Sequence, residues 1–188
     1  MRKLLVAVLA ALGLLAGGLV TATPAQAAPA GWGPWLMPTG TVCVQTGGST
    51  YWPIAKAVAA INATDASMVA RRSCTGYKRS MTVKLVAYYN SHDATCASTF
   101  SSGWTWAKVR GVWTWTPNAP YIKINFASWA KRHCQGTYAK RLWLMSHELL
   151  HVLGLDHREG ATVMMPSISR MRGSLLTRGD AYLVDRRY

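Results

Sequence analysis

Acidic side chains are scarce in this sequence, which has seven Asp and Glu against 21 Lys and Arg among 188 residues, for a formal net charge of +14. The basic residues occur singly and in pairs along the chain and never form a long block. Such an excess favours anionic partners, such as cell-wall polymers or acidic proteins, and gives no sign of specific nucleic-acid binding. A solvated surface that binds nothing is the simpler interpretation, because charge alone indicates no chemistry.

Long apolar runs are absent after residue 20, so no later segment predicts a membrane span. The one long run, at 4–20, follows two basic residues and precedes an A-x-A site at 25–27. This arrangement is typical of a cleaved secretory signal, with a membrane anchor as the alternative. We therefore expect a signal peptide over 1–27 and a mature, soluble domain over 28–188 that is secreted to the extracellular space.

Cysteine pairs with C-x-x-C spacing are also missing, which argues against a zinc site built from cysteines. The four cysteines, Cys43, Cys74, Cys96 and Cys134, all lie in the expected mature domain. An even number of cysteines in an exported chain predicts two disulfides. Their spacing does not select among the three possible pairings, of which we favour Cys43–Cys74 with Cys96–Cys134.

Local patterns predict one α/β (α+β) domain with a single sheet, since strand-like and helix-like segments follow one another without long repeats or low-complexity linkers. Alternating and β-branched residues predict strands at 39–46, 67–71, 81–89 and 121–126. Apolar residues at helical spacing predict helices at 52–66 and 136–153, and we expect a polar loop at 90–103.

Two copies of Trp-Thr-Trp stand close together, at 104–106 and 113–115. The segment between them predicts a hairpin that turns near Arg110 and Gly111 and carries each tryptophan pair on one face. Two interpretations stay open: an aromatic platform for a sugar or a peptide, or cross-strand packing beneath a loop. The second is the more ordinary use of tryptophan.

The second predicted helix contains His147, Glu148 and His151. The two histidines are four residues apart, so they lie about 40° apart around the helix axis and both imidazoles can reach one ion. Glu148 is rotated by about 100° from His147, close enough to act on a water molecule at that ion. H-E-x-x-H on a helix is a zinc-binding pattern. The histidines outside it, His92 and His133, are given no role.

A third ligand is needed, because catalytic zinc sites usually have three protein ligands and one open position. Gly154 tolerates a positive φ and predicts the end of the helix, after which the chain can bring His157 back to the same ion. The complete pattern, His-Glu-x-x-His-x-x-Gly-x-x-His, is too long to be expected by chance. Asp156 is a distant second candidate ligand, and Glu159 is interpreted as a solvated turn residue.

This pattern resembles that of the metzincin clan of zinc endopeptidases, and V-M-M-P at 163–166 is similar to the Met-turn of the matrixins. The end of the chain, L-T-R-G-D-A-Y-L-V-D-R-R-Y at 176–188, resembles the matrixin ending. The resemblance implies a mixed twisted sheet with two long helices, a zinc helix that ends at Gly154, a Met-turn and a C-terminal helix. It makes Met164 the turn methionine and places Pro166 in the wall of a substrate pocket.

Some residues depart from the clan's patterns. Astacin-like and serralysin-like members carry a tyrosine ligand two residues after the methionine, where this chain has Pro166, and the Pro-x-Tyr of matrixins ends here in Ile168. Carboxylates are too few for the calcium and structural zinc loops of animal matrixins, so calcium is not indicated. No cysteine-switch propeptide is visible. In length and export signal the chain is most similar to small secreted bacterial members, including snapalysin-like proteases, which use Asp where it has His157.

The resemblance implies a secreted, monomeric zinc endopeptidase that hydrolyses peptide bonds by metal-activated water. One zinc ion would be held by His147, His151 and His157, with Glu148 as general base. Protein or peptide substrates are expected to lie along an edge strand within 104–115. The alternative is a secreted, basic, zinc-containing protein that binds anionic cell-wall or matrix polymers without proteolysis. Structural zinc sites are normally closed by a fourth protein ligand, and none is apparent in the sequence.

Overall fold

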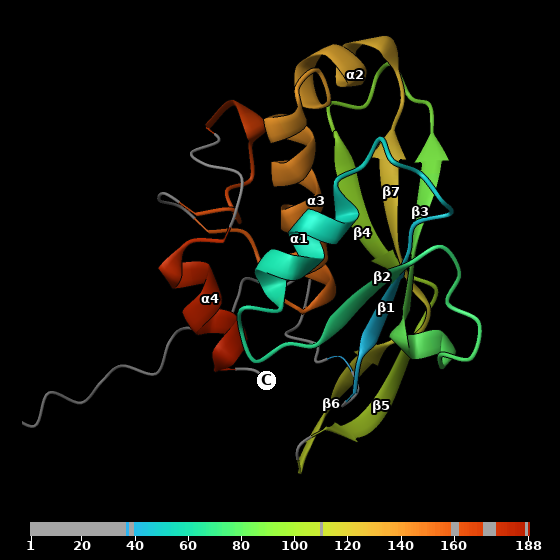
Figure 1. The fold of residues 1–188 in the computed structure, drawn as a ribbon, viewed down its shortest axis with the longest axis vertical. Helices are drawn as coiled ribbons and strands as arrows, with labels where there is room; N and C mark the ends of the chain where they lie inside the picture. The colour runs from blue at the N-terminus through green and yellow to red at the C-terminus, as the bar shows by residue number, and fades with distance from the viewer. Residues whose placement is uncertain (1–36, 38–39, 110, 159–161, 171–175, 187) are drawn as a thin grey trace, which may run out of the picture.

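The computed structural model describes residue 37 and residues 40–109, 111–158, 162–170, 176–186 and 188 (Figure 1). The signal peptide expected at 1–27 and the turn residue Glu159 lie outside the described residues. Within these ranges, no helix has the length and apolar character needed to cross a bilayer.

A five-stranded mixed sheet forms the centre of the domain, with strand order β2-β1-β3-β7-β4. Its strands are β1 Val42–Gln45, β2 Met68–Arg71, β3 Thr82–Tyr88, β4 Ala97–Ser101 and β7 Pro120–Asn125. The strands β2, β1, β3 and β7 pair with one another in parallel. The edge strand β4 pairs with β7 in antiparallel fashion. Four of these strands lie where the sequence predicts them, and the fold class is α/β with a mixed sheet.

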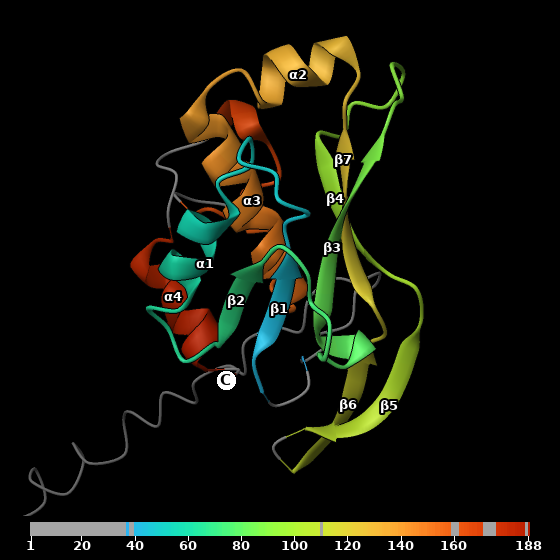
Figure 2. The ribbon, with the colours of Figure 1, turned by 45° about the vertical axis from the view of Figure 1, so that its right-hand side comes forward.

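Four α-helices are described: α1 Ile54–Ile61, α2 Ser128–Cys134, α3 Tyr138–Val152 and α4 Arg178–Asp185. Short 3₁₀ turns occur at Arg79–Met81 and Ile168–Arg170. In Figure 2, α1, α3 and α4 lie on one side of the sheet, and no described α-helix covers the other side. The core fills the covered side, where Leu149 and Leu150 of α3 are fully buried together with Ile122 of the sheet.

The predicted helix at 52–66 is shorter than expected, because α1 ends at Ile61. The next residue, Asn62, donates from Nδ2 to the carbonyl of Met68 at 2.7 Å and accepts the Met68 N–H at 2.8 Å. This pair of bonds turns the chain into β2. Asparagine competes with helical backbone bonding in this manner, so a local polar contact ends the helix at Ile61, the last residue of its buried stripe.

The polar loop predicted at 90–103 is wrong in its second half, which forms β4. The strand gives a weak sequence signal because its core-facing residues are Ala97 and Thr99, neither of which is a large apolar residue. The short helix α2 was likewise not predicted.

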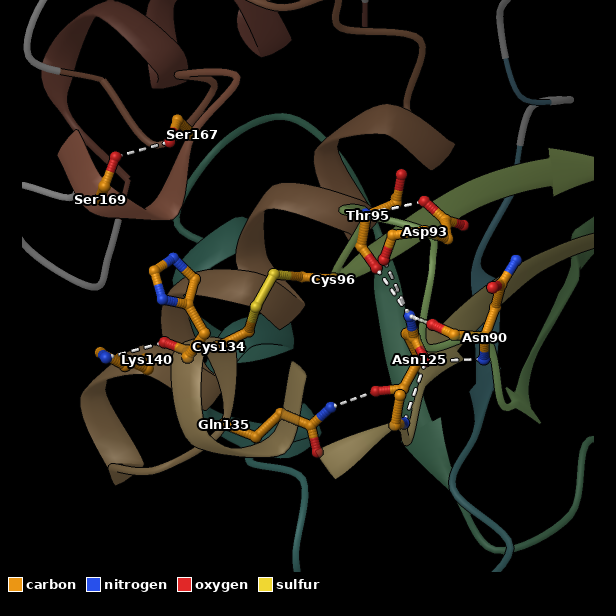
Figure 3. The surroundings of a disulfide bond; sticks show 12 residues. Asn90, Asp93, Thr95, Cys96, Asn125, Cys134, Gln135, Lys140, Ser167 and Ser169 are labelled. Atoms are coloured by element: carbon orange, nitrogen blue, oxygen red, sulfur yellow. Dashed lines mark hydrogen bonds between the residues drawn. A yellow bond between two sulfur atoms is a disulfide. The ribbon is translucent and has the colours of Figure 1, made fainter. Parts of the chain in front are cut away.

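Both disulfides have the favoured pairing, Cys43–Cys74 and Cys96–Cys134. Figure 3 shows the second one joining the residue before β4 to the end of α2. Nearby, Gln135 donates from its side chain to the carbonyl of Asn125 at 2.7 Å. The end of α2 is therefore linked to the sheet by a covalent bond next to β4 and by a buried polar contact with β7.

The Trp-Thr-Trp repeats form the predicted hairpin, with strands β5 Trp104–Val109 and β6 Val112–Pro117 in a separate two-stranded sheet. Figures 1 and 2 show this ribbon extending from the end of the main sheet. Its four tryptophans are between 42 % and 58 % exposed, so the interpretation that a loop covers them is wrong. The cross-strand packing which that interpretation included is present, since Trp106 meets Trp115 across the hairpin.

Candidate metal centre and its cleft

The helix α3 holds two of the three histidines in one stripe. Thr137 caps its N-terminus by accepting the N–H of Lys140 through its hydroxyl. One turn before His147, the indole of Trp143 stacks on the imidazole, with ring centres 4.9 Å apart and planes at 27°. His147 is 5 % exposed and His151 lies partly open, so the stripe runs from the core towards the surface.

The end of α3 orients the second histidine. Gly154 has a φ of 79°, and its N–H donates to the carbonyl of His151 at 2.8 Å. The N–H of Leu155 donates to the carbonyl of Leu150 at 3.0 Å, which completes a Schellman cap. The cap leaves the Leu155 carbonyl facing Nδ1 of His151 at 2.7 Å. The turn that ends the helix thus also positions a ligand.

The first histidine is held by the turn that contains the expected Met-turn residues. Nδ1 of His147 lies 2.8 Å from the carbonyl of Val163. The N–H of Val163 in turn donates to Oδ2 of Asp180 at 3.0 Å, and Asp180 is fully buried at the start of α4. Asp180 also forms a capping box with Thr177. The C-terminal helix is thereby connected to a histidine of the cluster through the backbone of one residue, Val163.

The three imidazoles converge through their Nε2 atoms. The separations are 3.1 Å for His147 and His151 and 3.2 Å from each of these to His157. Because Nδ1 of His147 and of His151 each faces a carbonyl, it carries the ring proton, and the two Nε2 lone pairs face one another. That arrangement is repulsive unless a cation lies between them.

A metal ion fits this cluster. Three nitrogens around a tetrahedral zinc ion would be about 3.3–3.4 Å apart, given bonds of 2.0–2.1 Å. The ligand atoms of His147, His151 and His157 all lie within 4.8 Å of one another. Burial lowers the pKa of His147 to about 3 and that of His151 to about 4, so both are neutral ligands at ordinary pH. The three histidines predicted as ligands are thus brought together, and they can hold a metal ion.

Glu148 is 2 % exposed and lines the same cavity as the histidines. Burial raises its pKa to about 7, and a hydrogen bond with Thr99 opposes the rise. The Thr99 hydroxyl lies 2.7 Å from Oε2 of Glu148 and 2.9 Å from the carbonyl of the same residue. The hydroxyl donates to the carboxylate and so stabilises its charged form, which is why this bond opposes the rise in pKa. The site therefore holds a carboxyl group that can exchange a proton near neutral pH.

The cavity has a volume of about 480 Å³ and lies between β4, α3 and the segments that follow α3. Residues 94–99 form one wall. The edge strand beside the site is therefore β4, and the expectation that it lies within 104–115 is wrong. Pro166 and Ile168 line the cavity on another side, as expected of Pro166, which is exposed.

Met164 is fully buried and follows directly after Val163. It is absent from the cavity lining, and its carbonyl accepts the N–H of Arg158 at 2.8 Å. Asp156 lies at the cavity but outside the histidine cluster, since its Oδ1 accepts the N–H of His157 at 2.9 Å. His133, given no role from the sequence, also lines the cavity.

Two residues of this site were missed in the sequence. Thr99 carries no local signal, because nothing in a short strand indicates which helix it faces. Asp180 could have been found, since Thr177 and Asp180 have the spacing of a capping box. Neither spacing nor composition would have indicated its bond to Val163.

Comparison with known proteins adds no family to this description. The chain matches no model of a known protein family, and no curated protein matches it significantly.

Proposed function

We propose that this protein is a secreted zinc-dependent endopeptidase. The observation that carries the proposal is the convergence of three Nε2 atoms, within 3.2 Å of one another, in a cavity that a buried glutamate shares. Histidine-only donor sets suit zinc among the common metals, and three protein ligands leave the open position of a catalytic site. The resemblance of residues 147–166 to the metzincin pattern supports the same assignment.

When bound, zinc supplies a Lewis acid that lowers the pKa of water and polarises a carbonyl group. The carbonyls of Leu155 and Val163 hold the rings of His151 and His147 in the orientation that presents Nε2. Thr99 engages Oε2 of Glu148, so we assign proton transfer to Oε1. Glu148 accepts a proton from the attacking water and delivers it to the leaving amine.

An extended peptide fits beside β4. This strand is the last in the sheet order, and no described strand pairs with its outer edge. Substrate can therefore be bound by backbone pairing with residues 94–99, which line the cavity, as an added strand. Pro166 and Ile168 lie across the cavity and would contact substrate side chains.

The two disulfides suit an oxidising compartment and so support an extracellular location. The alternative of a non-catalytic zinc protein is less favoured by the donor set. Structural zinc sites normally have four protein ligands, and the described part of the chain brings only three to this cluster. A buried glutamate beside the metal would also serve no purpose in a purely structural site.

A Glu148→Gln substitution tests the proposal directly. We expect zinc content to remain at one ion per chain, while cleavage of a mixed peptide library, read by mass spectrometry, falls by about 10²–10⁴-fold. Asp65→Asn, the same chemical change at an exposed position, is the matched control and should cleave as the parent does. Chelator should abolish cleavage by the parent. Undiminished cleavage by Glu148→Gln, or no cleavage by the zinc-loaded parent, would refute the proposal.

A further inference from the structure

The hairpin β5–β6 carries an aromatic surface that plays no part in the metal site. Its register pairs Trp106 with Trp115, Trp104 with Pro117 and Lys108 with Trp113. Directly opposed residues of an antiparallel pair share a face, so the four tryptophans and Lys108 lie on one side of the ribbon. We call this side the tryptophan face.

The tryptophan face is open to solvent. Its four indoles are at least 42 % exposed, whereas Trp52 and Trp143 elsewhere in the domain are at most 6 % exposed. With about 200–250 Å² for each indole, the exposed aromatic area is on the order of 500 Å², the size at which a surface patch is often functional. Packing in the core of this domain therefore does not explain the presence of these four tryptophans.

The indoles brace one another. The ring of Trp106 is nearly parallel to that of Trp113, at 8° and 6.4 Å between centres, and meets Trp115 edge-on at 5.1 Å. Pro117 lies opposite Trp104, so this side consists of the four indoles with one proline and Lys108. The surface is thus made of aromatic rings that support one another and remain at least 42 % exposed to solvent.

A basic groove lies at the base of the hairpin. Its lining includes Ser102 and Ala119, which flank the ribbon, together with the basic side chains of Arg79 and Lys84. None of the described residues that line it is acidic. The sequence has no Asp or Glu between Asp93 and Glu148, so the hairpin and the two strands that it extends carry no carboxylate. A ligand that contacts both surfaces meets indoles at one end and positive charge at the other.

We infer that the tryptophan face and this groove together bind an acidic polysaccharide. Sugar rings have a face of C–H groups that packs on indole, and their hydroxyls accept from indole N–H. Carboxylate or phosphate groups spaced along the chain are attracted to Arg79 and Lys84. Single-stranded nucleic acid is the competing occupant, because bases also stack on indoles, and the test below distinguishes the two. This inference is independent of the peptidase proposal.

The test measures binding of the intact, zinc-loaded protein to polygalacturonate, with neutral dextran, oligo-dT and anionic phosphatidylglycerol vesicles as competing probes. The parent should bind polygalacturonate most tightly, and more weakly as salt is added. The double variant Trp106→Thr/Trp115→Thr should bind about tenfold more weakly or worse. Arg79→Gln/Lys84→Gln should weaken binding and reduce its salt dependence.

Matched controls separate this site from general charge and from the metal centre. Tyr182→Thr removes an exposed aromatic ring from α4, and Lys56→Gln removes an exposed charge from α1; both should bind as the parent does. Glu148→Gln should bind polysaccharide normally, and the tryptophan variant should still cleave a short soluble peptide at the parent's rate. Trp113→Thr provides a milder change if the double variant is poorly folded.

Two results would overturn the inference. The first is unchanged polygalacturonate binding in both tryptophan variants. The second is tighter binding of the parent to oligo-dT, to vesicles or to dextran, since each of these would assign the surface to a different partner.

Discussion

The ladder formed by β4 and β7 has two ends that differ in what packs on them. At one end, Asn125 makes side-chain hydrogen bonds to the backbone of Asn90 and Thr95 (Figure 3). Its side chain also accepts the Ala127 N–H, and Thr99 contacts Glu148 in α3. At the other end the same two chain segments pair again as the hairpin β5–β6, without a shift in register. Ala97 pairs with Ile124 in the main sheet, and in the hairpin Trp104 pairs with Pro117, equally far along both segments. There the tryptophans face solvent.

One backbone pattern therefore supports a packed cavity at one end and an open aromatic surface at the other. The difference comes from side-chain networks and from the helical layer, because the strand pairing is the same kind in both. We accordingly expect changes at the packed end to alter stability, metal binding and catalysis together. Changes at the open end should alter only what the protein binds.

The largest expected effect is the loss of a disulfide. Removing Cys96–Cys134 by Cys96→Ala/Cys134→Ala should lower the free energy of unfolding by about 3–4 kcal/mol, because the bond closes a loop of sequence separation 38. Cys43→Ala/Cys74→Ala, with separation 31, is the matched control and should cost nearly the same in urea denaturation.

Only the first pair should also slow peptide cleavage, since Cys96 lines the cavity. Both variants should be assayed at temperatures well below their unfolding transitions. Equal cleavage rates would then show that the Cys96–Cys134 disulfide does not maintain the shape of the cavity.

A smaller effect is expected from Asp180→Ala, which removes the acceptor of the Val163 N–H and of the Thr177 cap. Leaving such donors unpaired in the interior should cost about 2–4 kcal/mol. Because the carbonyl of the same residue, Val163, orients His147, zinc affinity should also fall by about 10–100-fold in a chelator competition.

Asp185→Ala on the same helix is the control, as this carboxylate is exposed and bonds only to the N–H of Asp65 among the described contacts. It should leave zinc affinity unchanged. A loss of stability in Asp180→Ala with normal zinc affinity would mean that α4 supports the fold without positioning the ligand.

The metal site could be predicted because its geometry follows from local rules. The helical period places His147 and His151 on one stripe, and the positive φ of Gly154 lets His157 return. The resulting cluster agrees with the ligand set expected from the sequence alone. Spacing along one short segment contained the information.

Features that depend on distant packing were not predictable. Thr99 acts on Glu148 from 49 residues away, and its strand has a core face of only small side chains. The exposure of the tryptophans was not predictable for another reason: a tryptophan in a strand gives the same sequence pattern whether its indole is exposed or buried. Their alternation with threonine predicts the hairpin but not whether another element covers it.

A third prediction compares one glycine from each region. Gly154→Ala should destabilise the protein by about 1–2 kcal/mol, because its φ of 79° is unfavourable for a residue with a side chain. Gly103→Ala, at the base of the hairpin, meets no atom within 4 Å and has no left-handed φ, so it should be neutral or slightly stabilising. Thermal unfolding of the two variants measures the difference. A loss of zinc affinity is expected only for Gly154→Ala, which displaces the Leu155 carbonyl.

The smallest effect on stability is expected from Trp106→Thr, although it removes the largest kind of side chain. The ring is 52 % exposed and contacts mainly its hairpin neighbours, so cross-strand pairing accounts for under about 1 kcal/mol. Threonine also suits a strand, so the hairpin should persist. Urea denaturation should give nearly the parent's midpoint, while polygalacturonate binding weakens. A loss above about 2 kcal/mol would contradict the contrast between the two ends, because it would make the tryptophans part of the core instead of a surface kept open for a ligand.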